Sequence, residues 1–273
     1  IKLLVPTGQQ GTLYRWVAIL TGSKNTLKGV GFFLGGLLLM LMGFRGAVIL
    51  MALALGLVWL ASLFLLGQDL GKSRARPKFT DILSKSRAIN VLSAARMFLF
   101  GARDVWFVVA LPVYLATVFG WDFWQVGGFM ASWIIGYGVI QALAPRITGH
   151  GEGRRPAVLW AAALALIPAV MALALTGGGA SRAVVVGGLV LFGVLFAVNS
   201  ALHSYLIVRY ARADGVSLDV GFYYMSNAAG RLLGTVLSGW LYQSHGLPAC
   251  LGLSAVFVTV AALVSLRLPK PAT

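Results

Sequence analysis

Five basic residues lie inside strongly apolar stretches of this sequence, where charged side chains are costly. They are Lys24, Lys28, Arg96, Arg103 and Arg231, and the single acidic residue that accompanies them is Asp104. Each such charge costs roughly 2.5–3.5 kcal/mol at the centre of a bilayer on insertion scales. A surplus of buried positive charge predicts a water-filled cavity that receives an anion. Arg231 is the strongest candidate for a substrate contact, because its guanidinium fork suits a carboxylate or a phosphate.

The spacing of these residues predicts which of them share a helix face. Lys24 and Lys28 are four residues apart, and Asn227 precedes Arg231 by four, so each pair shares a face. Arg96 and Arg103, seven apart, also share one. We therefore assign all of these residues to substrate binding. For the lysines, the alternative is that both side chains reach back to the cytoplasmic interface.

Asp104 and His203 are the candidates for proton coupling. Asp104 directly follows Arg103 and points about 100° further around the helix, so we expect no good pair between them. Each would instead face a partner on another helix. Two roles stay open for Asp104, a structural salt bridge to a basic residue such as Arg231 or proton uptake during a transport cycle. His203 shares a face with Asn199 and is either a proton site or a hydrogen-bonded structural histidine.

The composition predicts a membrane protein. Of 273 residues, 59% are hydrophobic and only 11% are charged, against about 25% charged residues in soluble domains. The net charge of +15 suggests nucleic acid, but the basic residues gather on one side of the predicted membrane, so we expect no nucleic-acid partner. No metal-ligand spacing, phosphate-binding glycine loop or catalytic constellation is present. The sequence thus predicts neither a cofactor nor an enzyme.

Apolar stretches of about 20 residues mark the predicted helices. We expect an all-α integral membrane protein with eight transmembrane helices, at 12–41, 44–66, 88–118, 123–144, 157–176, 183–208, 221–242 and 248–266. Pro112 predicts a kink in the third of these. Small residues predict close helix contacts at Gly31 and Gly35, and again at Gly230, Gly234 and Ser238. Most tryptophans, Trp106 and Trp133 among them, are expected in the interfacial belt.

The basic residues fix the predicted orientation. Segments outside the membrane on one side contain only Arg45 and Arg182, whereas the loops and ends on the other side carry all the remaining Lys and Arg residues except the five within the apolar stretches. The positive-inside rule then places both ends of this segment in the cytoplasm. We expect a multi-pass protein of the cell (inner) membrane, with the lipid bilayer as its surroundings.

The longest loop divides the predicted helices into two and six. Residues 1–66 hold two helices, 67–87 form a basic cytoplasmic linker, and 88–273 hold six helices. This pattern resembles part of a major facilitator transporter, in which two six-helix halves flank a cytoplasmic loop. It implies a partial major facilitator fold: the last two helices of the first half and the complete second half. The sequence opens like the middle of a protein, so the four N-terminal helices are expected as missing partners of this chain.

Three longer strings are similar to a narrower family, the ArsJ-type major facilitator permeases of arsenic-resistance operons. The strings are LTGSKNTLKGVGFFLGG, KSRAINVLSAARMFLFGARDVWFVVALPVYL and VGGFMASWIIGYGVIQALAPRI. The resemblance implies efflux of an organoarsenical, 1-arseno-3-phosphoglycerate, which a dedicated glyceraldehyde-3-phosphate dehydrogenase produces. It therefore implies a functional link to that enzyme.

These observations predict a secondary-active efflux transporter for a small polyanionic organoarsenical that works by alternating access. Two alternatives remain. One is an organic-phosphate or drug exporter of the same fold, and the other is a membrane scaffold subunit that transports nothing. A dry interior in which every buried charge is paired would favour the scaffold.

Overall fold

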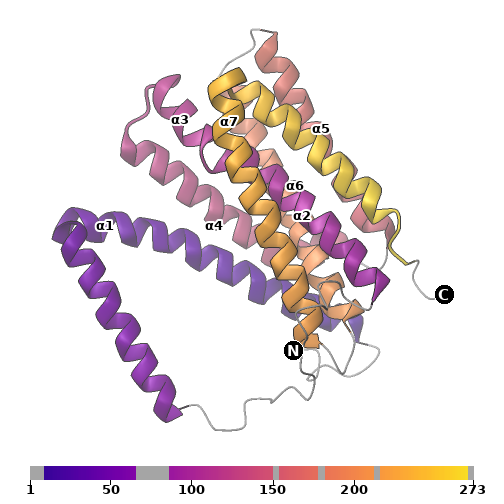
Figure 1. The fold of residues 1–273 in the computed structure, drawn as a ribbon, viewed down its shortest axis with the longest axis horizontal. Helices are drawn as coiled ribbons and strands as arrows, with labels where there is room; N and C mark the ends of the chain where they lie inside the picture. Colours follow the sequence, from indigo (N-terminus) through magenta and orange to yellow (C-terminus); the bar gives the residue numbers. More distant parts are fainter. Residues whose placement is uncertain (1–8, 66–85, 150–153, 178–181, 212–215, 270–273) are drawn as a thin grey trace.

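The computed structural model describes residues 9–65, 86–149, 154–177, 182–211 and 216–269, and Figure 1 shows their arrangement. All regular elements within these ranges are helices: α1 (Gln10–Leu65), α2 (Arg87–Phe107), α3 (Ala110–Thr117), α4 (Phe123–Thr148), α5 (Arg154–Thr176), α6 (Arg182–Tyr210) and α7 (Val216–Ser265). Counting α2 and α3 as one, six of the described helices are long and apolar enough to cross a membrane. The prediction of an all-helical, multi-pass membrane protein is confirmed, while most of the predicted linker 67–87 lies outside the described residues.

Two of the helices bend sharply at a glycine. Gly43 in α1 has φ 64° and Gly246 in α7 has φ 71°, backbone angles that glycine adopts without steric cost. Each helix consequently consists of two limbs that fold back at an angle (Figure 1). Both bends lie where the sequence predicts a turn between two spans. The expected total of eight spans stays a prediction, because α1 and α7 each count as one continuous helix here.

The predicted kink near Pro112 is confirmed, and it falls one turn before the proline. The helix is interrupted between α2 and α3, at Val108 and Val109. Proline has no amide hydrogen, and its ring collides with the carbonyl four residues earlier, here that of Val108. At this break the hydroxyl of Ser238 on α7 accepts a hydrogen bond from the amide of Ala110 (3.1 Å).

Glycines set the closest helix crossings. A Cβ placed on Gly234 of α7 would lie 2.6 Å from the carbonyl oxygen of Gly101 in α2, and one on Gly230 would overlap the backbone of Met97. The predicted small face of α7 is thus confirmed. On α1 the described residues place no atom within 4 Å of such a Cβ on Gly31 or Gly35, so the close contact expected there stays a prediction, whereas Gly22 meets the backbone of α4.

Aromatic side chains fill the core between α2, α4 and α6. Trp106 and Trp133 are buried, with ring centroids 5.9 Å apart, and Trp106 lies 5.0 Å from the ring of Phe192. The indole of Trp133 donates a hydrogen bond to the carbonyl of Leu189 (2.8 Å). The expectation of an interfacial belt is therefore wrong for these two tryptophans. A buried carbonyl takes the place of interfacial water as partner of the Trp133 N–H group.

The α2–α7 crossing yields a first prediction. Gly230→Ala should lower the free energy of unfolding by about 1–3 kcal/mol, because the new methyl group meets rigid backbone and forces the two helices apart. Thermal denaturation in detergent measures the change. Gly252→Ala is the matched control, since open space surrounds Gly252 and alanine favours the helix. Equal melting temperatures for the two variants would contradict the close packing.

Candidate functional site

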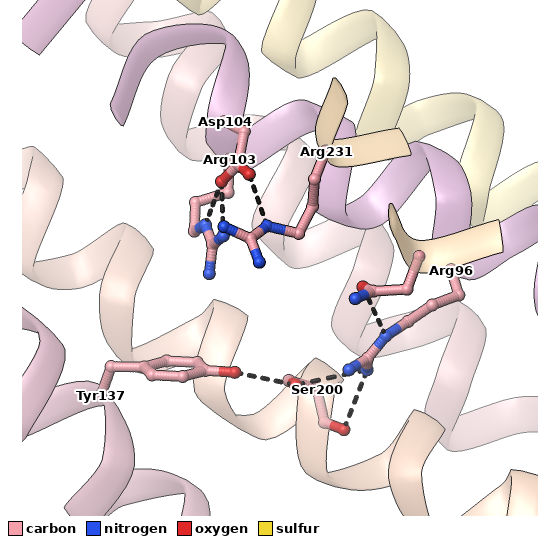
Figure 2. A network of polar contacts seen from close by, with 7 residues as sticks. Arg96, Arg103, Asp104, Tyr137, Ser200 and Arg231 are labelled. Atoms are coloured by element: carbon pink, nitrogen blue, oxygen red, sulfur yellow. Dashed lines mark hydrogen bonds and ion pairs between the residues drawn. The ribbon is translucent and has the colours of Figure 1, made fainter. Parts of the chain in front are cut away.

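Asp104 stands at the centre of the charged cluster. Its side chain is completely buried on α2, and each carboxylate oxygen is bound by a different arginine. Arg103 donates from Nε to Oδ1 (2.6 Å) and also pairs with the same oxygen through Nη2. Arg231 reaches across from α7 and donates from Nε to Oδ2 (2.8 Å). One carboxylate thus fixes two guanidinium groups side by side (Figure 2).

This geometry decides between the two expectations for Asp104. The salt bridge to Arg231 is confirmed, and the expectation that Arg103 and Asp104 do not pair is wrong. The Cβ atoms of adjacent helical residues point about 100° apart, but an arginine side chain is long and flexible enough to reach across that angle.

Both arginines keep hydrogen-bond donors that Asp104 does not use. Arg231 binds the carboxylate through Nε alone, so neither Nη1 nor Nη2 is bound to Asp104. Arg103 binds through Nε and Nη2 and keeps Nη1. The side chains of Arg103 and Arg231 are 13% and 42% exposed. Asp104 therefore orients the pair without saturating it, and the remaining donors can receive an anion.

The two lysines of α1 approach the same cluster. Lys28 is exposed and interacts electrostatically with Arg231, Arg103 and Asp104. Lys24 places its ammonium group 5.9 Å from the centre of the Tyr224 ring on α7. Of the acidic residues in the described ranges, only Asp104 belongs to this cluster. Its net charge is consequently positive, as the sequence predicts.

Arg96 forms a second, deeper positive centre. It is 5% exposed, its guanidinium group lies 3.7 Å from the centre of the Phe100 ring, and Nε donates to the amide oxygen of Asn227 (3.3 Å). Nη1 donates to both the carbonyl and the hydroxyl oxygen of Ser200 (3.3 Å each). These partners are all neutral, so within the described residues no carboxylate compensates the charge of Arg96.

Ser200 connects Arg96 to two residues of α4 that the sequence does not single out, Tyr137 and Gln141. Its Oγ also receives hydrogen bonds from the hydroxyl of Tyr137 (2.8 Å) and from Nε2 of Gln141 (3.2 Å), both on α4. Oε1 of Gln141 in turn accepts from the amide of Asn25 on α1 (2.6 Å). Gln141 could have been found as a lone amide in an otherwise apolar span, but its partners lie on other helices and cannot be read from spacing.

His203 and Asn199, expected on one helix face, have different surroundings. Asn199 donates to the carbonyl oxygen of Trp160 on α5 and to that of Leu195 on its own helix (2.9 Å each). His203 is buried, its charged neighbour is Arg96, and neither ring nitrogen has a hydrogen-bond partner among the described residues. The structure thus associates His203 with the deeper positive centre rather than with Asp104.

Comparison with known proteins gives one result. Residues 107–273, more than half of the chain, match the family model described as Major Facilitator Superfamily. A search of curated proteins finds no match. His203, Asn227 and Arg231 lie inside the matched region, whereas the site residues of α1 and α2 precede it.

The role of Asp104 leads to a second prediction. Asp104→Asn should lower the free energy of unfolding by about 3 kcal/mol, because it leaves Arg103 and Arg231 side by side with no counter-charge. Adding Arg103→Met should recover part of the loss by removing one of the repelling cations. Thermal denaturation of the purified protein measures both effects.

The matched control for this prediction is Asp122→Asn. Asp122 is an exposed helix cap that accepts from the amide of Gln125 (2.8 Å), and asparagine caps a helix as well as aspartate. A loss no larger for Asp104→Asn than for Asp122→Asn would show that the carboxylate does not hold the cluster.

Proposed function

The chain belongs to the major facilitator superfamily, a family of secondary transporters, and we propose that it carries a small organic anion. One observation supports this substrate class above all others. Two arginines from different helices share a single buried carboxylate, and their unused donors face the same way. Holding so much positive charge among apolar helices is costly, and a negatively charged substrate would offset that cost while it is bound.

For the substrate itself we propose a small polyanionic organoarsenical of the 1-arseno-3-phosphoglycerate type, moved outward. The resemblance to ArsJ-type permeases supports this choice, and a functional link to a glyceraldehyde-3-phosphate dehydrogenase would supply the compound. Phosphate and arsenate groups present several acceptor oxygens, which match the fork of an arginine. We propose that the donors of Arg103, Arg231 and Lys28 together bind one such group.

We further propose that transport follows alternating access in the cell (inner) membrane, with both ends of this segment in the cytoplasm. If the limbs on either side of Gly43 and Gly246 each cross the bilayer, the chain has eight spans. They would represent two helices of one half and six of the other, and four further helices would complete the carrier. The binding site would lie between the halves, near the middle of the membrane.

Proton coupling has a simple physical route in this site. An anionic substrate on the unused donors of Arg103 and Arg231 would be repelled by the Asp104 carboxylate, which binds the same two arginines. Protonation of Asp104 would remove its hold on Arg103 and Arg231 and free them for substrate, whereas deprotonation would favour release. His203, beside Arg96, is the second candidate for the proton. In either case proton and anion would bind together, so the outward gradient of the substrate itself would drive export.

Two alternatives remain for the function. A non-transporting scaffold would be expected to pair each buried charge, but Arg96 has only neutral partners among the described residues. A drug exporter of the same fold would typically require acidic residues to attract lipophilic cations, and the described cluster has a surplus of basic ones.

A third prediction concerns Arg231. Arg231→Ala should lower kcat/KM for uptake of a labelled organic phosphate into everted vesicles by about 10–100-fold, the effect expected when a charged hydrogen bond is lost. Arg231→Lys should retain part of the activity, because it keeps the charge but not the fork. Melting temperatures identify any loss caused by misfolding.

Arg45→Ala serves as the control, since Arg45 is exposed on the second limb of α1. Unchanged transport by Arg231→Ala would remove Arg231 from the site. Equal losses in both variants would indicate a non-specific effect of removing positive charge.

The substrate class provides a fourth prediction. 3-Phosphoglycerate should inhibit uptake of the labelled substrate competitively, whereas lipophilic cations such as tetraphenylphosphonium should not. The reason is electrostatic, because a cation meets the same sign of charge at Arg103 and Arg231. Uptake measured at increasing concentrations of each compound distinguishes the two. Inhibition by the cation alone would favour the drug exporter.

A further inference from the structure

We propose that Gln141 couples anion binding at Arg96 to the closure of α1 against α4. The role of an anion rests on the proposed function, whereas the connection between the residues rests on their hydrogen bonds alone. The side chain of Gln141 is hydrogen-bonded to two other helices: its Oε1 accepts from Asn25 of α1, and its Nε2 donates to Ser200 of α6. Ser200 also holds Arg96.

Helices α1 and α4 are closed at one end and open at the other. At the end that holds Tyr14 and Thr148, predicted to be cytoplasmic, these residues are hydrogen-bonded (3.0 Å), and further along Gly22 packs against the backbone of Gly138. Toward the opposite end the helices diverge (Figure 1). A groove of about 820 Å³ lies there, lined by residues of α1, α3 and α4, and Trp124 of α4 reaches across to Gly36 of α1.

The bond between Asn25 and Gln141 lies within the closed part of this contact. It is short (2.6 Å), and Gln141 is buried. The bond from Gln141 to Ser200 is longer (3.2 Å). The weaker of the two links therefore connects the α1–α4 contact to the deeper positive centre, and it is the link that a change at Arg96 would affect first.

Competition at one oxygen supplies the coupling. Tyr137, Gln141 and Arg96 all donate to Oγ of Ser200, but a hydroxyl oxygen has two lone pairs. The three donors cannot all bind well. When Arg96 turns toward an anion, it vacates a lone pair, and Gln141 can bind Ser200 more tightly. This holds the Gln141 amide in the orientation that accepts the hydrogen bond from Asn25. Binding of an anion to Arg96 therefore favours the closed α1–α4 contact.

The direction of this effect suits export. A substrate that enters from the side of Tyr14 and Thr148 would strengthen the contact that closes behind it. Ligand binding can shift such an equilibrium only through a difference in contacts between the two states. Here that difference is the hydrogen bond from Gln141 to Ser200.

A cysteine in the α1–α4 contact reports its opening. Thr26 lies against Gly138, so Thr26→Cys is protected while the helices touch. The only natural cysteine, Cys250, is buried and is replaced by serine. We measure the rate at which a membrane-permeant maleimide labels Thr26→Cys in the full chain in vesicles.

Variants without any ligand test the link itself. Arg96→Met removes the competing donor and should slow labelling by about two- to tenfold, the range that one hydrogen bond gives to an equilibrium. Gln141→Leu should accelerate labelling by a similar factor. In a Ser200→Ala background, which lacks the shared oxygen, Arg96→Met should have no effect. An Arg96→Met effect of equal size in both backgrounds would overturn the coupling.

A second set of measurements repeats the labelling in the presence of 3-phosphoglycerate. This compound should slow labelling in the parent protein but not in Gln141→Leu. Ser93→Ala is the control and should behave like the parent, because it alters a buried serine on α2 rather than Ser200 on α6. If the ligand-free variants behave as expected and the anion has no effect, the link holds and the proposed substrate class fails. If the anion slows labelling equally in the parent and in Gln141→Leu, the anion binds and the role of Gln141 is refuted.

Discussion

A shared carboxylate governs the electrostatics of this protein. Asp104 lies buried on α2 between two guanidinium groups, and it belongs to a cluster that otherwise contains only basic residues within the described part of the chain. A single negative charge cannot neutralise Arg103, Arg231 and Lys28 together. It can hold them close to one another, and the resulting positive potential selects the sign of whatever binds there.

The glycine crossing of α2 and α7 makes this arrangement feasible. Gly234 allows α7 to approach until a Cβ on it would lie 3.1 Å from the Cβ of Asp104. At that distance Arg231, less than one turn earlier, reaches Asp104 with its Nε. A larger residue at 234 would push the helices apart, and the interhelix ion pair would lengthen.

The deeper centre is built on neutral hydrogen bonds instead. Arg96, Ser200 and Gln141 link α2, α6 and α4, and Asn25 extends the network to α1. Neutral donors and acceptors can exchange partners at lower cost than buried ion pairs, because no bare charge is left behind. The two centres thus differ in kind: the first is a fixed pair of cations, and the second is a cation whose partners can change.

The amino-acid sequence was enough to predict the class of the protein and a surplus of buried positive charge. Apolar runs fixed the approximate positions of the helices, and Lys24, Lys28, Arg96, Arg103 and Arg231 stood out because charge within such runs is costly. The family match over residues 107–273 agrees with that class. The salt bridge from Asp104 to Arg231 could be named as an option, since few acids were available.

The contacts between helices could be identified only from the three-dimensional arrangement. The pair of Arg103 with Asp104, the partnership of Gln141 with Ser200, and the contact of Gly22 on α1 with the backbone of α4 all depend on helix rotation and crossing position. Helical periodicity gives the angle between residues on one helix. It does not give the angle at which that helix faces its neighbours, which packing of all the helices sets together.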